Sequence, residues 1–150
     1  NMLRFICLLA FAMMSATPAQ AGEELFQRLG GMETIERFVG RTIDLSVADE
    51  RIAASFGNTN LVRLKKLLTD QICQVSGGPC IYKGRDMRKS HAHLKITSYH
   101  FNALVENLQT AMDEENVPFA VQNELLAVLA PMHRDITAAP AATTAAPESR

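Results

Sequence analysis

The stretch GGPCIYKGRDMRKSHAHLKIT, residues 77–97, joins a glycine pair and a proline to five positively charged side chains and two histidines, His91 and His93. It has no clean apolar stripe, yet it contains too many apolar residues, among them Tyr82 and Met87, for an open loop. A long, partly ordered segment of this kind inside a compact helical domain is usually functional. The main question is therefore whether one of its histidines binds a ligand.

The sequence outside this stretch has helical periodicity. Apolar side chains recur three and four residues apart in four segments, and no alternating strand pattern of useful length is present. The four stripes are Ile35, Phe38, Val39, Thr42 and Ile43; Leu61, Leu64, Leu68, Ile72 and Val75; Phe101, Leu104, Val105, Leu108 and Met112; and Val121, Leu125, Leu129, Met132 and Ile136. The pattern predicts an all-α domain with four main helices of about 12–18 residues.

Turn residues separate these segments. Gly30-Gly31 ends a short opening segment, Gly77-Gly78-Pro79 ends the helix that begins near Leu61, and Pro118 stands near the first turn of the last helix. Glycine beyond a helix end and proline at a helix start are the usual arrangement.

The first residues have the features of a secretory signal peptide. Residues 2–21 carry one positive charge at Arg4, an apolar run from Phe5 to Met14, and a small-x-small site that ends at Ala21. The alternative is an uncleaved anchor, but a run of about ten residues is too short to span a bilayer. We expect residues 1–21 to be removed and the mature chain to be periplasmic or secreted, with no membrane attachment.

The mature chain is predicted to be one domain, residues 22–137, followed by a tail, residues 138–150. The tail is rich in alanine, threonine and proline and has no larger apolar residue, so we expect it to be disordered. Without residues 1–21, 14 basic residues face 16 acidic ones, for a net charge of −2. This charge does not indicate a nucleic-acid or anionic-membrane surface.

Two cysteines remain in the predicted mature chain, Cys73 and Cys80, with six residues between them. In an oxidising compartment a disulfide is favoured over two free thiols. The glycine pair 77–78 allows the reversal that so short a loop needs. Closing this loop should contribute roughly 2–3 kcal/mol to stability on the chain-entropy estimate.

Three interpretations of the histidines remain open on the residues alone. A structural zinc site of Cys73, Cys80, His91 and His93 has the right number of ligands but unusual spacings, and a disulfide would consume the thiolates. Solvated histidines in a basic loop are the simplest interpretation. The third is a noncovalent heme with one neutral imidazole as axial ligand, because a covalent Cys-x-x-Cys-His attachment motif is absent.

A resemblance to a known family bears on this choice. The segments LFQRLGGMETIERFV, RIAASFGNTNLVRLK, GGPCIYKGRDMRKSH, ITSYHFNALVENL and VLAPMHRDI occur in this order. Together they resemble the group I truncated hemoglobins over about residues 24–137. The resemblance implies the two-over-two helical sandwich of these proteins and a bound heme b.

The resemblance also implies roles for individual residues. It places the proximal iron ligand on His91, and not on His93 or His100. It implies heme contacts by Phe56, Leu64, Leu68, Met87, Ile96, Phe101, Leu104 and Leu129. It makes Thr59, Arg63, Lys83 and Arg85 candidates for binding the heme propionates.

The distal pocket departs from the family pattern. Many members have a tyrosine where this sequence has Ile43, a glutamine where it has Leu68, and some have a histidine where it has Leu67. With Leu64, these residues imply a largely apolar pocket, in which Thr42 and Gln71 are the polar residues with a chance of reaching a ligand. Lys65 or Lys66 would bind iron only with a lowered pKa and a rotated helix.

The function expected from the sequence is reversible binding of a diatomic gas, such as dioxygen, nitric oxide or carbon monoxide, by an exported monomer. We expect no dedicated catalytic residues, so that nitric oxide dioxygenation or peroxidase activity would be heme chemistry tuned by the pocket. A reductase or other electron donor of unknown identity is the expected partner. The alternative is a heme-free, disulfide-linked helical interaction module.

Overall fold

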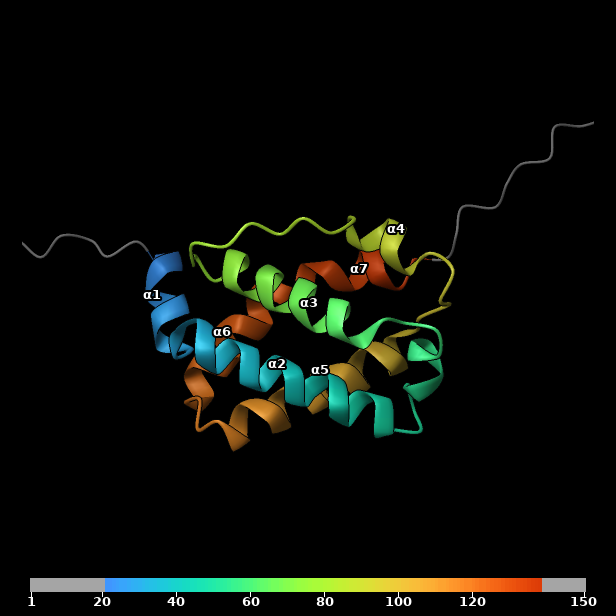
Figure 1. Ribbon diagram of the computed structural model, residues 1–150, viewed down its shortest axis with the longest axis horizontal. Helices are drawn as coiled ribbons and strands as arrows, with labels where there is room; N and C mark the ends of the chain where they lie inside the picture. The colour runs from blue at the N-terminus through green and yellow to red at the C-terminus, as the bar shows by residue number, and fades with distance from the viewer. Residues whose placement is uncertain (1–20, 139–150) are drawn as a thin grey trace, which may run out of the picture.

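The computed structural model describes residues 21–138 (Figure 1). Most of the predicted signal peptide, residues 1–20, and the predicted tail from residue 139 lie outside the described residues. The described chain contains no strand. Its helices are α1 (Ala21–Arg28), α2 (Gly31–Ala48), α3 (Leu61–Val75), α4 (Met87–His91), α5 (Ser98–Glu114), α6 (Phe119–Leu129) and α7 (His133–Ile136), with 3-10 turns at Ala53–Phe56 and Ala130–Met132. The predicted all-α class is confirmed.

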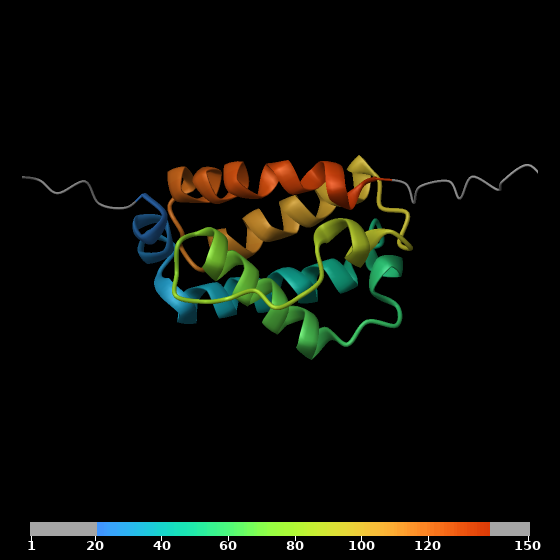
Figure 2. The ribbon, with the colours of Figure 1, turned by 90° about the horizontal axis from the view of Figure 1, so that it is seen from above.

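Four helices form the body of the molecule as two packed pairs. Helix α2 packs against both α3 and α5, and α5 packs against α6. Seen from above, α2 and α3 lie on one side and α5 and α6 on the other (Figure 2). The short helices α4 and α7 pack against each other at one end, and α1 lies at the opposite end (Figures 1 and 2). This is the two-over-two sandwich that the family resemblance implied.

Side chains fix where several helices begin. The Asn60 side chain accepts a hydrogen bond from the backbone N–H of Arg63 at the start of α3, at 3.0 Å. Asp86 does the same for Lys89 in α4, at 2.9 Å. Such caps satisfy backbone donors that the first helical turn leaves unpaired, each typically worth about 1 kcal/mol. Both capped helices border the cavity described below.

The second glycine pair turns the chain out of α3. Gly77 has a φ of +86°, a left-handed conformation that glycine adopts without steric cost. At Gly78 an added Cβ would stand 2.5 Å from the Phe26 ring and 2.7 Å from the sulfur of Cys73. Residues 78–86, here called the strap, then run along the outside of α3 to reach α4 (Figures 1 and 2). Cys73 and Cys80 are joined at the start of this strap, with Cα atoms 5.7 Å apart, which agrees with the predicted disulfide.

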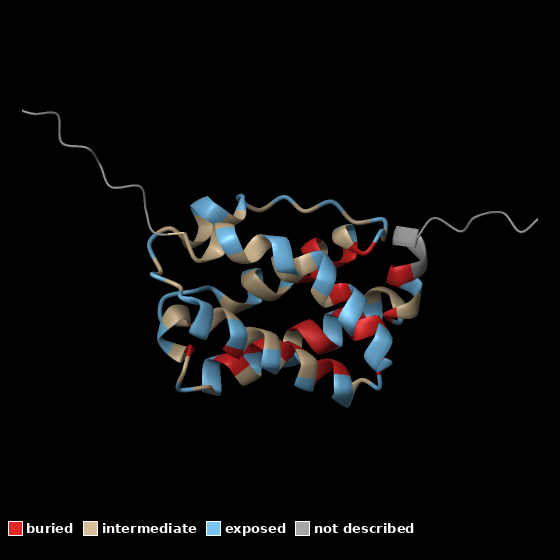
Figure 3. Cartoon of the chain, turned by 180° about the vertical axis from the view of Figure 1, so that it is seen from behind, coloured by how far each residue is buried: buried red, intermediate tan, exposed pale blue. Residues whose placement is uncertain are grey.

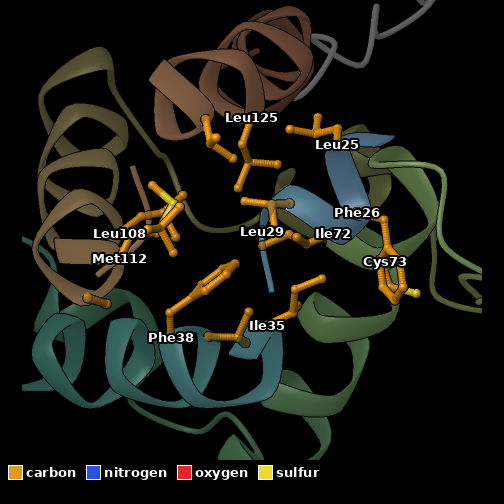
Figure 4. Close-up of a cluster of buried hydrophobic side chains, with 14 residues drawn as sticks. Leu25, Phe26, Leu29, Ile35, Phe38, Ile72, Cys73, Leu108, Met112 and Leu125 are labelled. Carbon is orange, nitrogen blue, oxygen red and sulfur yellow. The ribbon is translucent and has the colours of Figure 1, made fainter. Parts of the chain in front are cut away.

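The hydrophobic core lies toward the α1 end (Figure 4). Phe38, Met112 and Leu125 are fully buried there. Polar groups in the core are satisfied locally: the Gln122 side chain donates to the Val117 carbonyl oxygen at 2.9 Å. No helix of the described chain is long and apolar enough to cross a membrane.

The last apolar stripe is not one helix. The sequence pattern from Val121 to Ile136 predicted a continuous helix, but α6 ends at Leu129 and a 3-10 turn containing Pro131 separates it from α7. Proline has no backbone N–H and so cannot continue the α-helical bonding pattern. The apolar side chains of the stripe nevertheless face one cavity, which Leu129, Met132 and Ile136 all line.

Candidate functional site

A large cavity opens between the helices at the α4 end. Its volume is about 610 Å³, and it is lined mainly by leucine, isoleucine, phenylalanine and methionine side chains from α2, α3, α4, α5 and α6. Small-molecule and cofactor pockets in proteins usually enclose about 300–1,000 Å³ with a mostly apolar lining and a few polar groups. In Figure 3 the residues around α4 are coloured intermediate or exposed, whereas the buried residues gather nearer to α1. The cavity accounts for this difference.

Most of the residues predicted for the site line this one cavity. They are Thr42, Ile43, Phe56, Thr59, Leu64, Leu67, Leu68, Gln71, Met87, His91, Ile96, Phe101, Leu104 and Leu129. Arg63, Lys83 and Arg85 are exposed side chains outside the lining, so their predicted contact with propionates stays a prediction. The roles of the lining residues toward a heme also stay predictions.

The sequence analysis missed several residues of the lining. They include Ile52, Tyr82, Leu94, Val105, Leu126 and Met132. Val105 and Met132 belong to apolar stripes that the sequence shows, so continuing each stripe around its helix would have found them. Leu94 follows α4 in a turn with no periodicity, and only the fold brings it to the cavity.

His91 is held in one tautomer on the cavity wall. Its Nδ1 lies 2.8 Å from the backbone carbonyl oxygen of Met87, one turn earlier in α4. A carbonyl can only accept a hydrogen bond, so Nδ1 carries the proton and Nε2 keeps its lone pair. This arrangement, in which one ring nitrogen donates to a carbonyl, is typical of histidines that bind a metal through the other nitrogen. His91 lines the cavity and is half-buried.

The other two histidines on the lining lack this arrangement. The Nδ1 of His100 accepts a hydrogen bond from the backbone N–H of Thr97 at 3.1 Å, as part of the cap of α5. In its neutral form the proton of His100 is therefore on Nε2, which then has no lone pair to give. His93 is exposed, and no hydrogen bond from residues 21–138 orients its ring. Of the three, only His91 combines a fixed tautomer with a free ring nitrogen.

The wall formed by α2 and α3 presents aliphatic side chains. Ile43, Leu64, Leu67 and Leu68 line the cavity from these two helices. Thr42 lies beside them, but its hydroxyl donates to the Phe38 carbonyl oxygen at 2.7 Å within α2. Because that proton is already used, the hydroxyl can act toward a ligand mainly as an acceptor.

Gln71 is the other polar side chain of this wall. It is buried, and its Nε2 lies 3.5 Å from the sulfur of Met87 and 3.6 Å from that of Met132. Thioether sulfur is a weak acceptor. The amide points toward these two methionines, which come from α4 and the 3-10 turn before α7.

Lys65 and Lys66 are engaged elsewhere. The Nζ of Lys65 lies 2.7 Å from a carboxylate oxygen of Asp44, and that of Lys66 lies 2.8 Å from Asp70. Neither lysine lines the cavity. Coordination of iron by either would require breaking an ion pair as well as turning α3.

Tyr82 forms part of the wall next to α4. Burial, and then the negative charge of Asp86, raises the pKa of its phenol above the ordinary value. The hydroxyl therefore stays protonated, and it donates to the Arg85 carbonyl oxygen at 2.8 Å. The backbone N–H of Tyr82 also donates to the side chain of Gln74 in α3. The bond to Gln74 holds the strap against α3 on its way to His91, and the bond to Arg85 is local to the strap.

The donor set fits a heme better than the zinc site considered above. Across residues 21–138, no three His, Cys, Asp or Glu side chains gather as a metal-binding group. Cys73 and Cys80 are joined to each other. The cavity instead offers a broad apolar enclosure with one oriented imidazole on its wall, which is what a heme with a proximal histidine requires.

An all-α sandwich with an apolar cavity and a histidine in its wall defines the globin class, and comparisons with known proteins identify the branch. Residues 24–138 match the family described as bacterial-like globin. A group 1 truncated hemoglobin from Tetrahymena pyriformis is 32% identical over 114 residues, which cover 76% of this chain and 94% of that protein. One from Mycolicibacterium paratuberculosis is 31% identical over 112 residues, covering 75% and 82%.

Solved structures give the same result. The truncated hemoglobin of Tetrahymena pyriformis in its Fe(III) form superposes with a TM-score of 0.72 at 32% identity, covering 75% of this chain and 96% of that one. The 2/2 hemoglobin from Synechococcus sp. PCC 7002, in the cyanomet state with covalently attached heme, gives 0.71 at 28% identity, covering 75% and 97%. The chain belongs to the bacterial-like globin family and is a group I truncated hemoglobin. Heme-based binding of diatomic gases is the general function of such proteins.

Proposed function

We propose that this protein binds a noncovalent heme b through His91 and reversibly binds a diatomic gas on the opposite, apolar side. The bond from the His91 Nδ1–H to the Met87 carbonyl oxygen, at 2.8 Å, carries the assignment of the proximal ligand. It fixes the ring orientation and leaves Nε2 available toward the cavity. A heme held there supplies an iron coordination site that a gas can occupy.

The remaining lining supports the other parts of this proposal. Phe56, Phe101 and Leu104 offer apolar surface for the faces and edge of a planar macrocycle. The aliphatic side chains of α2 and α3 exclude water from the ligand side. Both described cysteines are joined in a disulfide, which leaves no thiol there for covalent attachment.

Replacing His91 by glycine tests the proximal assignment. We expect His91→Gly to abolish stable heme binding, seen as loss of the Soret band, and added imidazole to restore it by filling the space left by the ring. His93→Ala and His100→Ala, the matched controls, should keep the Soret band. Loss of heme in His93→Ala or His100→Ala, with heme retained in His91→Gly, would show that another histidine is the ligand.

The apolar ligand side favours weak retention of dioxygen. Bound dioxygen carries partial negative charge, and a hydrogen bond to it is worth about 1.5–3 kcal/mol. Ile43, Leu64 and Leu68 offer no donor, so dioxygen should dissociate fast and the ferrous protein should autoxidise readily. Carbon monoxide is less polar when bound and should be retained well. We therefore propose a high preference for carbon monoxide over dioxygen, and gas binding without dedicated catalytic residues.

The cellular location and attachment chemistry have direct tests. We propose that the mature chain begins at Gly22, is exported as a monomer, and contains one disulfide, as the sequence pattern and the joined cysteines support. The intact mass of protein from an exporting host should lack residues 1–21 and rise by about 2 Da on reduction. Heme should be extractable into acid butanone; heme that stays with the protein would contradict noncovalent binding.

A further inference from the structure

The charges of this protein are segregated around the cavity. Residues 83–95, here called the basic segment, carry five cations, Lys83, Arg85, Arg88, Lys89 and Lys95, and one acid, Asp86. The rest of the described chain, residues 21–82 and 96–138, has eight cations and fourteen acids. With neutral histidines, the basic segment has a net charge of +4 and the remainder −6.

Ion pairing increases the difference in charge between the basic segment and the rest of the described chain. Six of the eight cations outside the basic segment are paired with carboxylates, as in the 2.7 Å contact from Arg41 to Glu114. In the basic segment Arg88 pairs with Asp135 and Lys89 with Asp86. Lys83, Arg85 and Lys95 are exposed and have no ion-pair partner among the described residues. Their charge is therefore not neutralised within the described chain.

The same segment forms one wall of the cavity. Met87, Ser90, His91, His93 and Leu94 line the cavity, while the cations between and beside them are exposed. An unneutralised positive surface thus lies directly outside the wall that holds His91. Ile81, just before the segment, is 70% exposed and adds an apolar group to the charged surface. A charged surface with an apolar contact is typical of transient protein–protein docking sites.

We propose that the basic segment docks an acidic electron-transfer protein that reduces the heme iron. This inference rests on the proposed function, because a pocket that favours autoxidation needs an electron source. The partner gives up one electron, the iron passes from Fe(III) to Fe(II), and no bond or proton need be exchanged. Positive charge at the docking surface would steer an acidic partner and raise its association rate.

An anionic membrane surface is the competing partner for such a segment. Interfacial segments combine their cations with a broad apolar face that enters the lipid. Ile81 is the large exposed apolar residue of residues 77–97, which is too little for such a face. The acidic protein is therefore the better match.

Reduction kinetics test the proposal with a matched pair of variants. The triple variant Lys83→Gln, Arg85→Gln, Lys95→Gln removes three positive charges from the basic segment. The control Arg37→Gln, Arg41→Gln, Lys66→Gln removes three from the acidic remainder. Reduced flavodoxin, an acidic one-electron donor, is mixed anaerobically with each ferric holoprotein in a stopped-flow instrument. Amide chemical shifts of the labelled wild-type holoprotein with oxidised flavodoxin report docking independently of electron transfer.

We expect the basic-segment variant to be reduced roughly tenfold more slowly at low salt, and the control to stay within about twofold of the wild type. The difference should vanish by about 0.3 M salt, because the charges are then screened. Shift changes should centre on residues 81–95. Equal rates in both variants would overturn the proposal.

Two other results would also overturn it. Faster heme loss from the basic-segment variant with an unchanged reduction rate would mean that these cations bind heme propionates instead. Wild-type binding to vesicles with about one third phosphatidylglycerol, lost in this variant without a change in rate, would mean a membrane site. Failure of the proposed function itself would be distinct, because the wild type would then show no Soret band.

Discussion

The two ends of the helical sandwich are built from the same helices but packed to different extents. At the α1 end, the buried residues of α2 and α6, such as Phe38 and Leu125, are excluded from solvent entirely. At the α4 end, α3, α5 and α6 present large apolar side chains, such as Leu64, Phe101 and Leu129, that are only half-buried. One end is closed by its own side chains, and the other encloses about 610 Å³.

This difference in packing separates the apolar residues that stabilise the fold from those that would contact the cofactor. A half-buried leucine on a cavity wall contributes less to the apoprotein than a fully buried one, because it still lacks contacts on one side. A bound heme would supply those contacts. The packed end should therefore determine whether the chain folds, and the open end should gain most of its stability from ligand binding.

Two phenylalanines give the largest expected effect. Phe38→Ala should lower the free energy of unfolding of the apoprotein by about 3–5 kcal/mol, because it leaves a cavity in close-packed surroundings. Phe101→Ala, the matched substitution at the open end, should cost less than half of this in the apoprotein and relatively more in the holoprotein. Urea unfolding of both forms provides the measurement. Equal losses in the apoprotein would show that the open end is packed as tightly as the core.

The disulfide lies at the packed end and anchors the start of the strap that leads from α3 to α4. Cys80→Ser should lower the free energy of unfolding by roughly 2–3 kcal/mol. It should also speed heme transfer to an apomyoglobin acceptor, because the strap that leads to His91 becomes less constrained. Reduced wild type, the control, should behave as the variant does. Unchanged stability in both would mean that the native contacts around Cys73 hold the strap without the bond.

The helices could be predicted from the sequence, but the difference between the packed end and the open end could not. The stripe that contains Phe38 and the one that contains Leu64 have the same periodicity, and periodicity reports which face is apolar, not what covers that face. The turns at the glycine pairs could be predicted because turns and helix ends depend on local sequence. The position of His91 after the second pair could be recognised for the same reason. The separation of Leu61–Val75 into a half-buried first part and a buried last part depends on tertiary packing.

Prediction of the site residues from the sequence is limited in the same way. His91, Phe56 and Leu68 were assigned through the family resemblance, and the fold brings them to one cavity. Leu94 stood out as apolar within residues 77–97, but it lies in an irregular turn, and no periodicity assigned it to the site. The pairing of Lys65 with Asp44 joins residues 21 positions apart on different helices and was also not visible. Long-range side-chain contacts of this kind require the packed structure.

The ligand side of the open end offers the next test. Ile43→Tyr should add a hydrogen-bond donor and slow dioxygen dissociation by roughly ten- to a hundredfold, since 1.4 kcal/mol corresponds to tenfold. Ile43→Phe adds the ring without the hydroxyl and should leave the rate much closer to the wild type. Laser photolysis and stopped-flow mixing measure both. If the wild type already releases dioxygen slowly and Gln71→Leu speeds it, then Gln71 turns toward the ligand and the pocket has a donor after all.

The smallest effect concerns a polar clamp between the end of α2 and helix α5. Asp49, just after α2, pairs with Arg51 at 2.8 Å, and Arg51 also reaches Glu106 of α5. Hydrogen bonds from Arg51 lower the pKa of Asp49 from 3.8 to about 2. Asn107 of α5 donates to the same carboxylate at 3.1 Å.

A folded-state pKa below the unfolded value means that the unfolded chain binds the proton more tightly. The stabilisation by Asp49 is therefore fully present above about pH 4 and is lost as the pH falls toward 2. Asp49→Asn should be less stable than the wild type at neutral pH, and the two should converge in this acidic window. Asp44→Asn, whose carboxylate pairs with Lys65 on the exposed side of α3, is the control. Urea unfolding at pH 6, 4 and 2.5 measures the convergence. A constant gap between wild type and Asp49→Asn across this range would mean that the ion pair does not hold α2 to α5. The open end would then depend on its apolar lining alone.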